Sequence, residues 1–230
     1  MSGRNSHLKY ILAGFAVVCL VFLINTSSGA GKEAPTGEFI RGVDVSYVTR
    51  VEDKDGSFFH RDGTPGDVFE ILQANGVNTV RFRLWNDPEE GYCNLADVMA
   101  LSTRAHQAGL KILLDFHYSD VWADPGTQTK PAAWESLSYT ELVQAVREYT
   151  YEVVLAMIAQ GTPPDMVQIG NEISNGFLWP DGNVWKSGKW DVFCGLIKAG
   201  IAGAKEVDPA VKTMIHLAWG GQNAQSKSFL

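Results

Sequence analysis

The sequence predicts an α/β fold in which parallel strands alternate with helices. Five apolar runs of strand length recur along the chain, at 39–45, 77–84, 110–116, 166–170 and 212–217. Longer stretches with the periodicity of helices lie between these runs. The turns that lead from helix to strand are short, whereas the loops that lead from strand to helix are long, as is common where loops carry function. Units of this kind build a parallel sheet.

Residues typical of helix ends bound the stretches between the strands. Ser138 and Glu141 form a capping box, which predicts that the third helix begins there. Proline near a start and glycine at a close mark most of the other ends. These ends are the start of the first helix at Thr64 and Pro65, its close at Asn75 and Gly76, the closes of the second and third helices at Gly109 and Gly161, and a fourth helix over 190–207.

Two architectures fit this alternation, and the end of the first strand separates them. A dinucleotide-binding sheet needs a glycine-rich turn there, but residues 44–47 contain no glycine. We therefore predict a (β/α)8 TIM barrel, incomplete here, with about the first five βα units in residues 39–230. Such barrels carry their catalytic groups at the carboxyl ends of the strands. The polar residues at these ends are Asp44, Arg81, Arg83, Asn86, Asp115, His117, Asn171, Glu172 and His216.

The fourth apolar run ends in an amide and an acid, Asn171 and Glu172. An amide can hydrogen-bond a sugar hydroxyl while the adjacent acid holds or releases a proton, a combination that suits glycoside cleavage. The same pair could instead begin a helix, with Asn171 as the capping residue. The dipeptide alone favours neither interpretation.

All seven tryptophans are expected at the carboxyl ends of strands or in the connections that follow, and none inside a helix. Core packing does not explain this placement, whereas stacking on the apolar faces of sugars does. About half of them are expected to pack loops onto the barrel rim instead. Trp85, Trp179 and Trp219 are the ones expected nearest to a ligand.

Composition and charge limit the classes of partner. The chain is 45% hydrophobic, which is sufficient for the core of one globular domain, and its formal charge is −7. A negative charge disfavours binding to a phosphate backbone, so no nucleic-acid partner is expected. Cys93 and Cys194 have no framework spacing and are expected to be unpaired thiols.

Residues 1–30 are predicted to be a signal peptide and residues 31–38 a short linker. Arg4 and Lys9 precede an uncharged apolar run over 10–24, and small residues follow at 28–30. The run is shorter than the about 20 residues that a membrane-spanning helix needs, which disfavours an anchor. We therefore expect a secreted protein without stable membrane association.

Several motifs together resemble glycoside hydrolase family 53. They are residues 81–85 (RFRLW), 115–120 (DFHYSD), 122–125 (WADP), 168–172 (QIGNE) and 178–180 (LWP). Members of this family are endo-β-1,4-galactanases that act on pectic arabinogalactan, so the resemblance implies a retaining glycosidase with a β-1,4-galactan substrate and no cofactor. It also implies that Glu172 is the proton donor and acid/base, and that Asn171 bonds the sugar 2-hydroxyl.

The mechanism implied by the resemblance needs a second carboxylate as nucleophile. In the family this is a glutamate on strand seven, which is expected beyond Leu230, so the chain is interpreted as the amino-terminal part of a longer enzyme. Arg83 is expected to face the barrel mouth, to keep the nucleophile ionised and to pair with Asp44. The resemblance gives Asp44 and Asp115 supporting roles. The expected substrate-binding residues are Asn171, Arg83, Asp44, Asp115, His117, Trp85, Trp179, His216 and Trp219.

Other functions remain as alternatives. A metal-dependent hydrolase could use His117, His216 and Asp115, but strand one lacks the paired histidines usual in such barrels, so no metal site is expected in this chain. A non-catalytic carbohydrate-binding protein would keep the tryptophans and lack an acid, and another retaining β-glycanase of the same clan would share the catalytic pair. The resemblance leaves a calcium site open in loops later than Leu230, and a monomer is expected.

Overall fold

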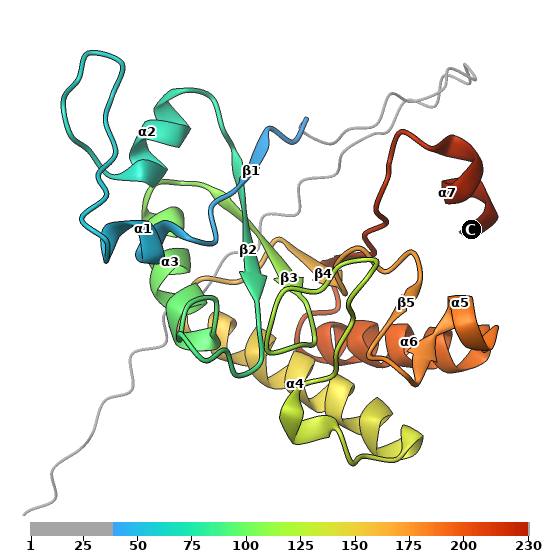
Figure 1. Cartoon of the computed structure of the whole chain (residues 1–230). Coiled ribbons are helices and arrows are strands. Elements are labelled where there is room, and N and C mark those ends of the chain that lie inside the picture. The colour runs from blue at the N-terminus through green and yellow to red at the C-terminus, as the bar shows by residue number, and fades with distance from the viewer. Residues whose placement is uncertain (1–38, 230) are drawn as a thin grey trace, which may run out of the picture. The chain divides into compact units, whose positions relative to one another are not determined.

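The computed structural model of the 230-residue chain describes residues 39–229 (Figure 1). The predicted signal peptide over 1–30 and the linker over 31–38 lie outside these residues and stay predictions. Among the helices of the described part, none has the length and apolar character that crossing a membrane requires. Cys93 is buried and Cys194 is exposed, and neither forms a disulfide.

A parallel sheet of five strands forms the centre of the fold (Figure 1). Its order is β1-β2-β3-β4-β7, so neighbours in the sequence are neighbours in the sheet, as in the first units of a (β/α)8 barrel. The strands are β1 (Gly42–Asp44), β2 (Thr79–Leu84), β3 (Lys111–Phe116), β4 (Met166–Ile169) and β7 (Lys212–Met214). The predicted fold class is confirmed, although the first and last strands are shorter than predicted, and residues 215–217 form a loop.

Helices cover one side of this sheet. The structure contains α1 (Val48–Glu52), α2 (Val68–Ala74), α3 (Leu95–Gln107), a 3-10 turn (Ala132–Trp134), α4 (Tyr139–Gln160), α5 (Val184–Ser187), α6 (Trp190–Val207) and α7 (Asn223–Phe229). A two-stranded hairpin of β5 (Gly176–Phe177) and β6 (Gly182–Asn183) follows β4. Helices α4 and α6 pack so closely that a Cβ atom at Gly203 of α6 would lie only 2.3 Å from the carbonyl oxygen of Arg147 in α4. Only glycine fits at this position.

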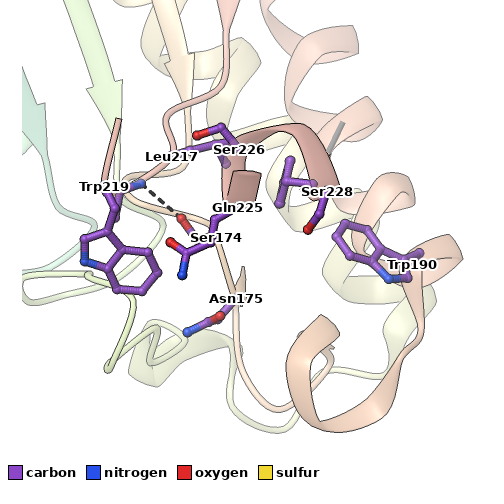
Figure 2. A pocket seen from close by; sticks show the side chains of 10 residues that line it. Ser174, Asn175, Trp190, Leu217, Trp219, Gln225, Ser226 and Ser228 are labelled. Carbon is purple, nitrogen blue, oxygen red and sulfur yellow. Dashed lines mark hydrogen bonds between the residues drawn. The ribbon is translucent and has the colours of Figure 1, made fainter. Parts of the chain in front are cut away.

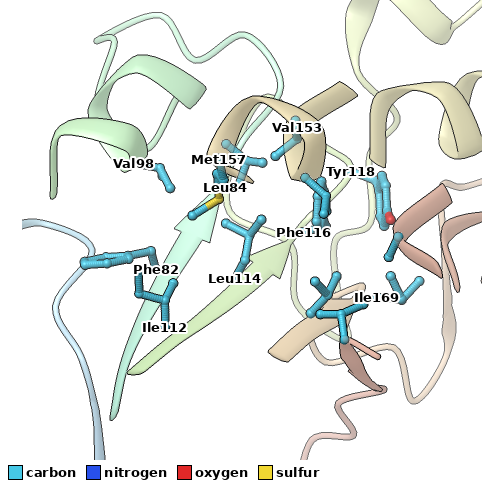
Figure 3. Close-up of a cluster of buried hydrophobic side chains, with 14 of the residues drawn as sticks. Phe82, Leu84, Val98, Ile112, Leu114, Phe116, Tyr118, Val153, Met157 and Ile169 are labelled. Atoms are coloured by element: carbon cyan, nitrogen blue, oxygen red, sulfur yellow. The ribbon is translucent and has the colours of Figure 1, made fainter. Parts of the chain in front are cut away.

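The two faces of β2 differ in chemistry, since successive side chains of a strand point to opposite faces. Phe82 and Leu84 are fully buried and point toward the helices, where they join a cluster that contains Met157 of α4 (Figure 3). Arg81 and Arg83 alternate with them and therefore lie on the other face of the sheet. Apolar contacts thus hold the helix layer to the sheet, while polar groups gather on the opposite face.

Most of the predicted helix ends are confirmed. The Ser138–Glu141 capping box is present, and Gly161 ends α4 in the left-handed conformation, with φ 90°. The fourth predicted helix, 190–207, coincides with α6. One start is wrong: α2 begins at Val68 rather than at Thr64 and Pro65, because the carboxylate of Asp67 caps it by accepting a hydrogen bond from the Phe69 amide at 2.8 Å.

The predicted placement of the tryptophans needs a correction. Trp134 lies in the 3-10 turn, Trp185 lies within α5, and Trp190 is the first residue of α6. These elements follow strand ends, so the loop regions were located correctly. The 3-10 turn and α5 escaped the prediction, whereas α6 was predicted to begin at residue 190. A helix of four residues such as α5 is too short to show a periodic pattern in the sequence.

Candidate active site

The carboxyl ends of the strands converge on one arginine, Arg81. Its Nη1 lies 2.6 Å from Asp44 Oδ2, and its Nη2 lies 2.6 Å from Asp115 Oδ2. Nη2 also donates a hydrogen bond to Asn171 Oδ1 at 2.7 Å. The predicted site gave the role of the strand-two cation to Arg83, whereas Arg81, which the predicted site left out, is the arginine that contacts Asp44, Asp115 and Asn171. The sequence contained a signal for it, because strand alternation places residues 81 and 83 on the same face.

Asp115 is the buried anion of this group, with 0% of its side chain exposed. It pairs with Arg81 and accepts hydrogen bonds from Gln168 Nε2 and from His117 Nε2, the latter at 3.0 Å. Three donors therefore compensate the charge that burial would otherwise make unfavourable. In this structure Asp115 lies beneath the surface that a ligand would touch, which fits a supporting role better than direct contact with substrate.

His117 is fixed in one tautomer by its neighbours. Its Nδ1 lies 3.1 Å from Trp85 Nε1 and 3.1 Å from the Ala123 amide nitrogen, and both of these groups are donors. Nδ1 must therefore accept, so the proton is on Nε2, which donates it to Asp115. Both ring nitrogens are occupied, which leaves no lone pair for a metal ion. Within residues 39–229, no group of three or more His, Cys, Asp or Glu side chains converges as a metal site.

Asp44 is the more accessible partner of Arg81. It accepts hydrogen bonds from the Ser46 hydroxyl at 2.7 Å and from the Ser46 amide at 3.1 Å. Partial burial acts to raise the pKa of Asp44, but the Ser46 hydrogen bonds and Arg81 outweigh it and hold the pKa below the ordinary 3.8. The carboxylate is therefore ionised across the physiological range, in a position to anchor Arg81.

The chain turns sharply at the end of β4. Gly170 has φ 79°, and a side chain there would approach Ile173 Cγ2 to 2.5 Å. Glu172 follows with φ 51°, a conformation uncommon for residues other than glycine, and such strained residues cluster at active sites. A hydrogen bond from the Ile173 amide to the His216 carbonyl oxygen, at 2.9 Å, holds this turn to the loop after β7.

Asn171 is held by three groups and is only 2% exposed. Its Oδ1 accepts from Arg81 and lies 2.9 Å from His216 Nδ1, and its Nδ2 donates to the Ala123 carbonyl oxygen at 2.8 Å. An amide nitrogen carries two hydrogens, so one of them remains for a ligand. The partly exposed Glu172 is adjacent, and Asn171 and Glu172 therefore leave the sheet as one oriented unit.

His216 contributes a pH dependence to stability. Burial lowers its pKa below the ordinary 6.5, and the positive charge of Arg81 lowers it further. The unfolded chain therefore binds more protons between this lowered pKa and 6.5, so the free energy of unfolding should fall as the pH drops through that window. We expect His216→Gln to flatten this slope in urea unfolding measured from pH 7 downward. The exposed His106 provides the control, and an equal effect of His106→Gln would contradict the assignment.

Arg83 has mainly aromatic partners. Its guanidinium carbon lies 4.4 Å from the ring centroid of Tyr47 and 4.4 Å from that of Trp122. The predicted ion pair with Asp44 is present but long, at 3.8 Å. Among the described residues, Arg83 Nε has no hydrogen-bond partner. Arg83 is thus held between two rings, an arrangement suited to its planar, weakly hydrated cation.

The three tryptophans expected near a ligand differ in their surroundings. Trp85 donates its indole N–H to His117, so it belongs to the polar network. Trp179 is partly buried, its backbone amide donates to the Gln128 carbonyl oxygen at 2.7 Å, and its buried indole N–H has no hydrogen-bond partner among the described residues. Trp219 is 50% exposed and lines a pocket of about 210 Å³ beside α7, here called the α7 pocket (Figure 2).

The polar network around Arg81 lies at the strand ends next to the carboxyl group of Glu172. Arg81 joins β1, β3 and the end of β4, and His117 and His216 hold the flanking loops. Asp44 and Asp115, the other strand-end acids of the described part, are both paired with Arg81. The site can therefore orient the amide of Asn171 and the carboxyl group of Glu172, but its other strand-end carboxylates already pair with Arg81.

Comparisons with known proteins show the family of this chain. The sequence profile described as glycosyl hydrolase family 53 matches residues 40–230. An arabinogalactan endo-beta-1,4-galactanase of Thermothelomyces thermophilus is 42% identical over 190 residues, which cover 80% of this chain and 56% of that protein. An endo-beta-1,4-galactanase of Bacillus subtilis (strain 168) is 34% identical over 192 residues, which cover 80% of this chain and 43% of that protein.

Solved structures show the same relationship. The GH53 catalytic domain of Ignisphaera aggregans superposes with a TM-score of 0.78 at 44% identity, covering 85% of this chain and 56% of that one. A structure from a study of two fungal beta-1,4-galactanases gives a TM-score of 0.75 at 36% identity, covering 82% of this chain and 57% of that one. The chain thus spans about half the length of the relatives it matches.

Proposed function

Because this chain belongs to glycosyl hydrolase family 53, we propose that it forms part of a retaining endo-β-1,4-galactanase that is secreted and cleaves galactan side chains of pectin. The observation that carries the proposal is the oriented pair Asn171 and Glu172 at the carboxyl end of β4, supported by Arg81 and His216. The galactanase names of the relatives support the choice of substrate. The protein is proposed to act as a monomer.

In this proposal Glu172 protonates the leaving glycosidic oxygen and later acts as base toward water. The second N–H of Asn171 donates to the sugar 2-hydroxyl. Asp115 and His117 position these groups from below, since both are buried, and Arg83 presents its charge toward the nucleophile. The reaction needs no cofactor, because the acid and the nucleophile are both protein carboxylates.

The nucleophile is proposed to come from the region of the family that this chain does not span. A retaining mechanism requires two carboxyl groups about 5–5.5 Å apart. Asp44 and Asp115 are each held by Arg81 at 2.6 Å, and Asp115 is inaccessible, so neither is free to attack a sugar.

A chimera tests the proposal. In it, this chain is followed by the carboxyl-terminal part of the Bacillus subtilis relative. We expect the chimera to release galacto-oligosaccharides from linear β-1,4-galactan but not from β-1,4-mannan, and the 230-residue chain alone to show no measurable hydrolysis. Chromatography of the products measures both. Robust hydrolysis by the chain alone would return the nucleophile role to Asp44 or Asp115, and preference for mannan would replace galactanase with another β-glycanase.

A further inference from the structure

The α7 pocket is a cavity that the proposed acid chemistry does not use. It lies between the loops after β4 and β7 and the helix α7 (Figure 2). Trp219 and Trp190 stand on opposite sides of it, and Ser174, Asn175 and Gln225 lie between them (Figure 2). Its volume of about 210 Å³ is below the range of drug-sized pockets, which indicates a small ligand or one ring of a larger one.

Hydrogen bonds fix this pocket relative to Glu172. Ser174 is two residues beyond Glu172, and its hydroxyl accepts from the Ala218 amide at 3.0 Å, next to Trp219. The neighbouring Ile173 amide bonds to the His216 carbonyl oxygen at 2.9 Å. The loops after β4 and β7 are therefore tied together at two points, so a ligand in the pocket has a defined place relative to the acid.

The walls of the pocket are equally well held. Phe229 of α7 packs against Trp190 and Phe193, with ring centroids 5.3 and 5.8 Å apart. The Asn175 side chain donates to the Pro125 carbonyl oxygen at 2.9 Å, which aims it from the β4 loop. Aromatic contacts thus hold helix α7 against α6, and hydrogen bonds hold the loops after β4 and β7, so the elements that line the pocket are all fixed in place.

The chemistry of the lining selects a neutral polyol. Not one of the 10 lining residues has a charged side chain, which disfavours phosphates, carboxylates and cations. The half-exposed indole of Trp219 offers a flat apolar surface, and Ser174, Asn175 and Gln225 offer hydroxyl and amide groups. In the part of the chain that the structure describes, Asn175 Oδ1 and the side-chain amide of Gln225 have no hydrogen-bond partner, so they are available to sugar hydroxyls, whereas the Gln225 backbone amide donates to the Gln222 carbonyl oxygen.

We propose that the α7 pocket is a subsite for one galactosyl unit of the polysaccharide, adjoining the unit whose bond is cleaved. Trp219 stacks on the apolar face of the sugar, while Asn175 and Gln225 bond its hydroxyls. The inference rests on the proposed function, because that function names the sugar. Such a subsite would make binding depend on the length of the galactan chain, because only a chain long enough to reach the α7 pocket gains these contacts. The pocket residues are separate from the group around Arg81.

Calorimetric titration of the 230-residue chain with β-1,4-galactotetraose tests the subsite. We expect Trp219→Ala to weaken binding about tenfold or more, and Gln225→Ala to weaken it by a smaller factor. Trp219→Phe, which keeps a ring, should retain most of the affinity. Trp185→Ala is the matched control, because Trp185 is 75% exposed on α5 and does not line the pocket. Circular dichroism confirms that each variant is folded.

Each outcome is decisive. If the chain binds galactotetraose and both Trp219→Ala and Gln225→Ala leave the affinity unchanged, the subsite is refuted while the proposed hydrolase function stands. Absence of binding by the unsubstituted chain, or binding of mannotetraose in its place, also refutes a galactosyl subsite. The chimera assay judges the function separately, since galactan hydrolysis there does not depend on the titration.

Discussion

Replacing Glu172 with alanine in the chimera should slow hydrolysis of natural β-1,4-galactan about 10²- to 10⁴-fold, the usual contribution of a positioned proton donor. An aryl galactoside with an acidic phenol as leaving group needs little protonation, so its cleavage should suffer a much smaller loss. Initial rates on both substrates measure these effects.

A matched control separates chemistry from folding. Glu148 is exposed on α4 and bonds to Gln144 within the same helix, so Glu148→Ala should leave both rates unchanged. If Glu172→Ala lowered the two rates by the same factor, the residue would not be the proton donor. A loss of binding without change in the rate constant would point instead to substrate positioning.

Replacing Arg81 with methionine should cause the largest loss of stability, about 3–5 kcal/mol in the free energy of unfolding. The reason is that Asp115, with 0% exposure, would keep its charge without the cation that compensates it. The double variant Arg81→Met with Asp115→Asn should recover part of this loss, because the buried charge is then removed as well. Urea unfolding measures the free energy of unfolding of the unsubstituted 230-residue chain, of Arg81→Met and of the double variant.

Arg104 provides the comparison. It also pairs with two acids, Glu52 and Asp67, each at 2.7 Å, but all three side chains are about one-third exposed. Solvent screening reduces the value of each such pair to about 0–1 kcal/mol. Arg104 forms a bidentate pair with Glu52 and a second pair with Asp67, so Arg104→Met should cost more than a single exposed pair but less than Arg81→Met. Equal losses from the two arginine variants would show that burial of Asp115 does not determine the energy.

The sequence allowed the fold to be predicted because its signals are local. The βα alternation, the capping box at Ser138 and the glycine at 161 depend on residues close together in the chain, and all three were confirmed. The ends of β1 and β7 were misplaced, since an apolar run can continue beyond its strand: Ile215 and Leu217 lie in a loop that packs on the core, whereas Phe39 and Ile40 before β1 are exposed. The short helices α1 and α5 and the β5–β6 hairpin carry too few residues for a periodic pattern.

The site was harder to predict, because its contacts join distant segments. Asn171 and Glu172 could be located from the abrupt end of an apolar run. The choice between Arg81 and Arg83 could not be made, since alternation places both on the same face and only the depth along the strand separates them. Likewise, the tautomer of His117 depends on Trp85 and Ala123, which no local pattern connects to it.

The alternation of charged and apolar side chains in β2 also affects folding fidelity. A slip of one residue in the pairing of this strand would exchange its two faces. Arg81 and Arg83 would then point into the hydrophobic core between the sheet and α4, and Phe82 and Leu84 would lie on the polar face of the sheet. Burying two unpaired guanidinium groups is far costlier than losing ladder hydrogen bonds, so misaligned pairings are strongly disfavoured. Arg81 and Arg83 therefore also help to specify the register in which β2 pairs with its neighbouring strands.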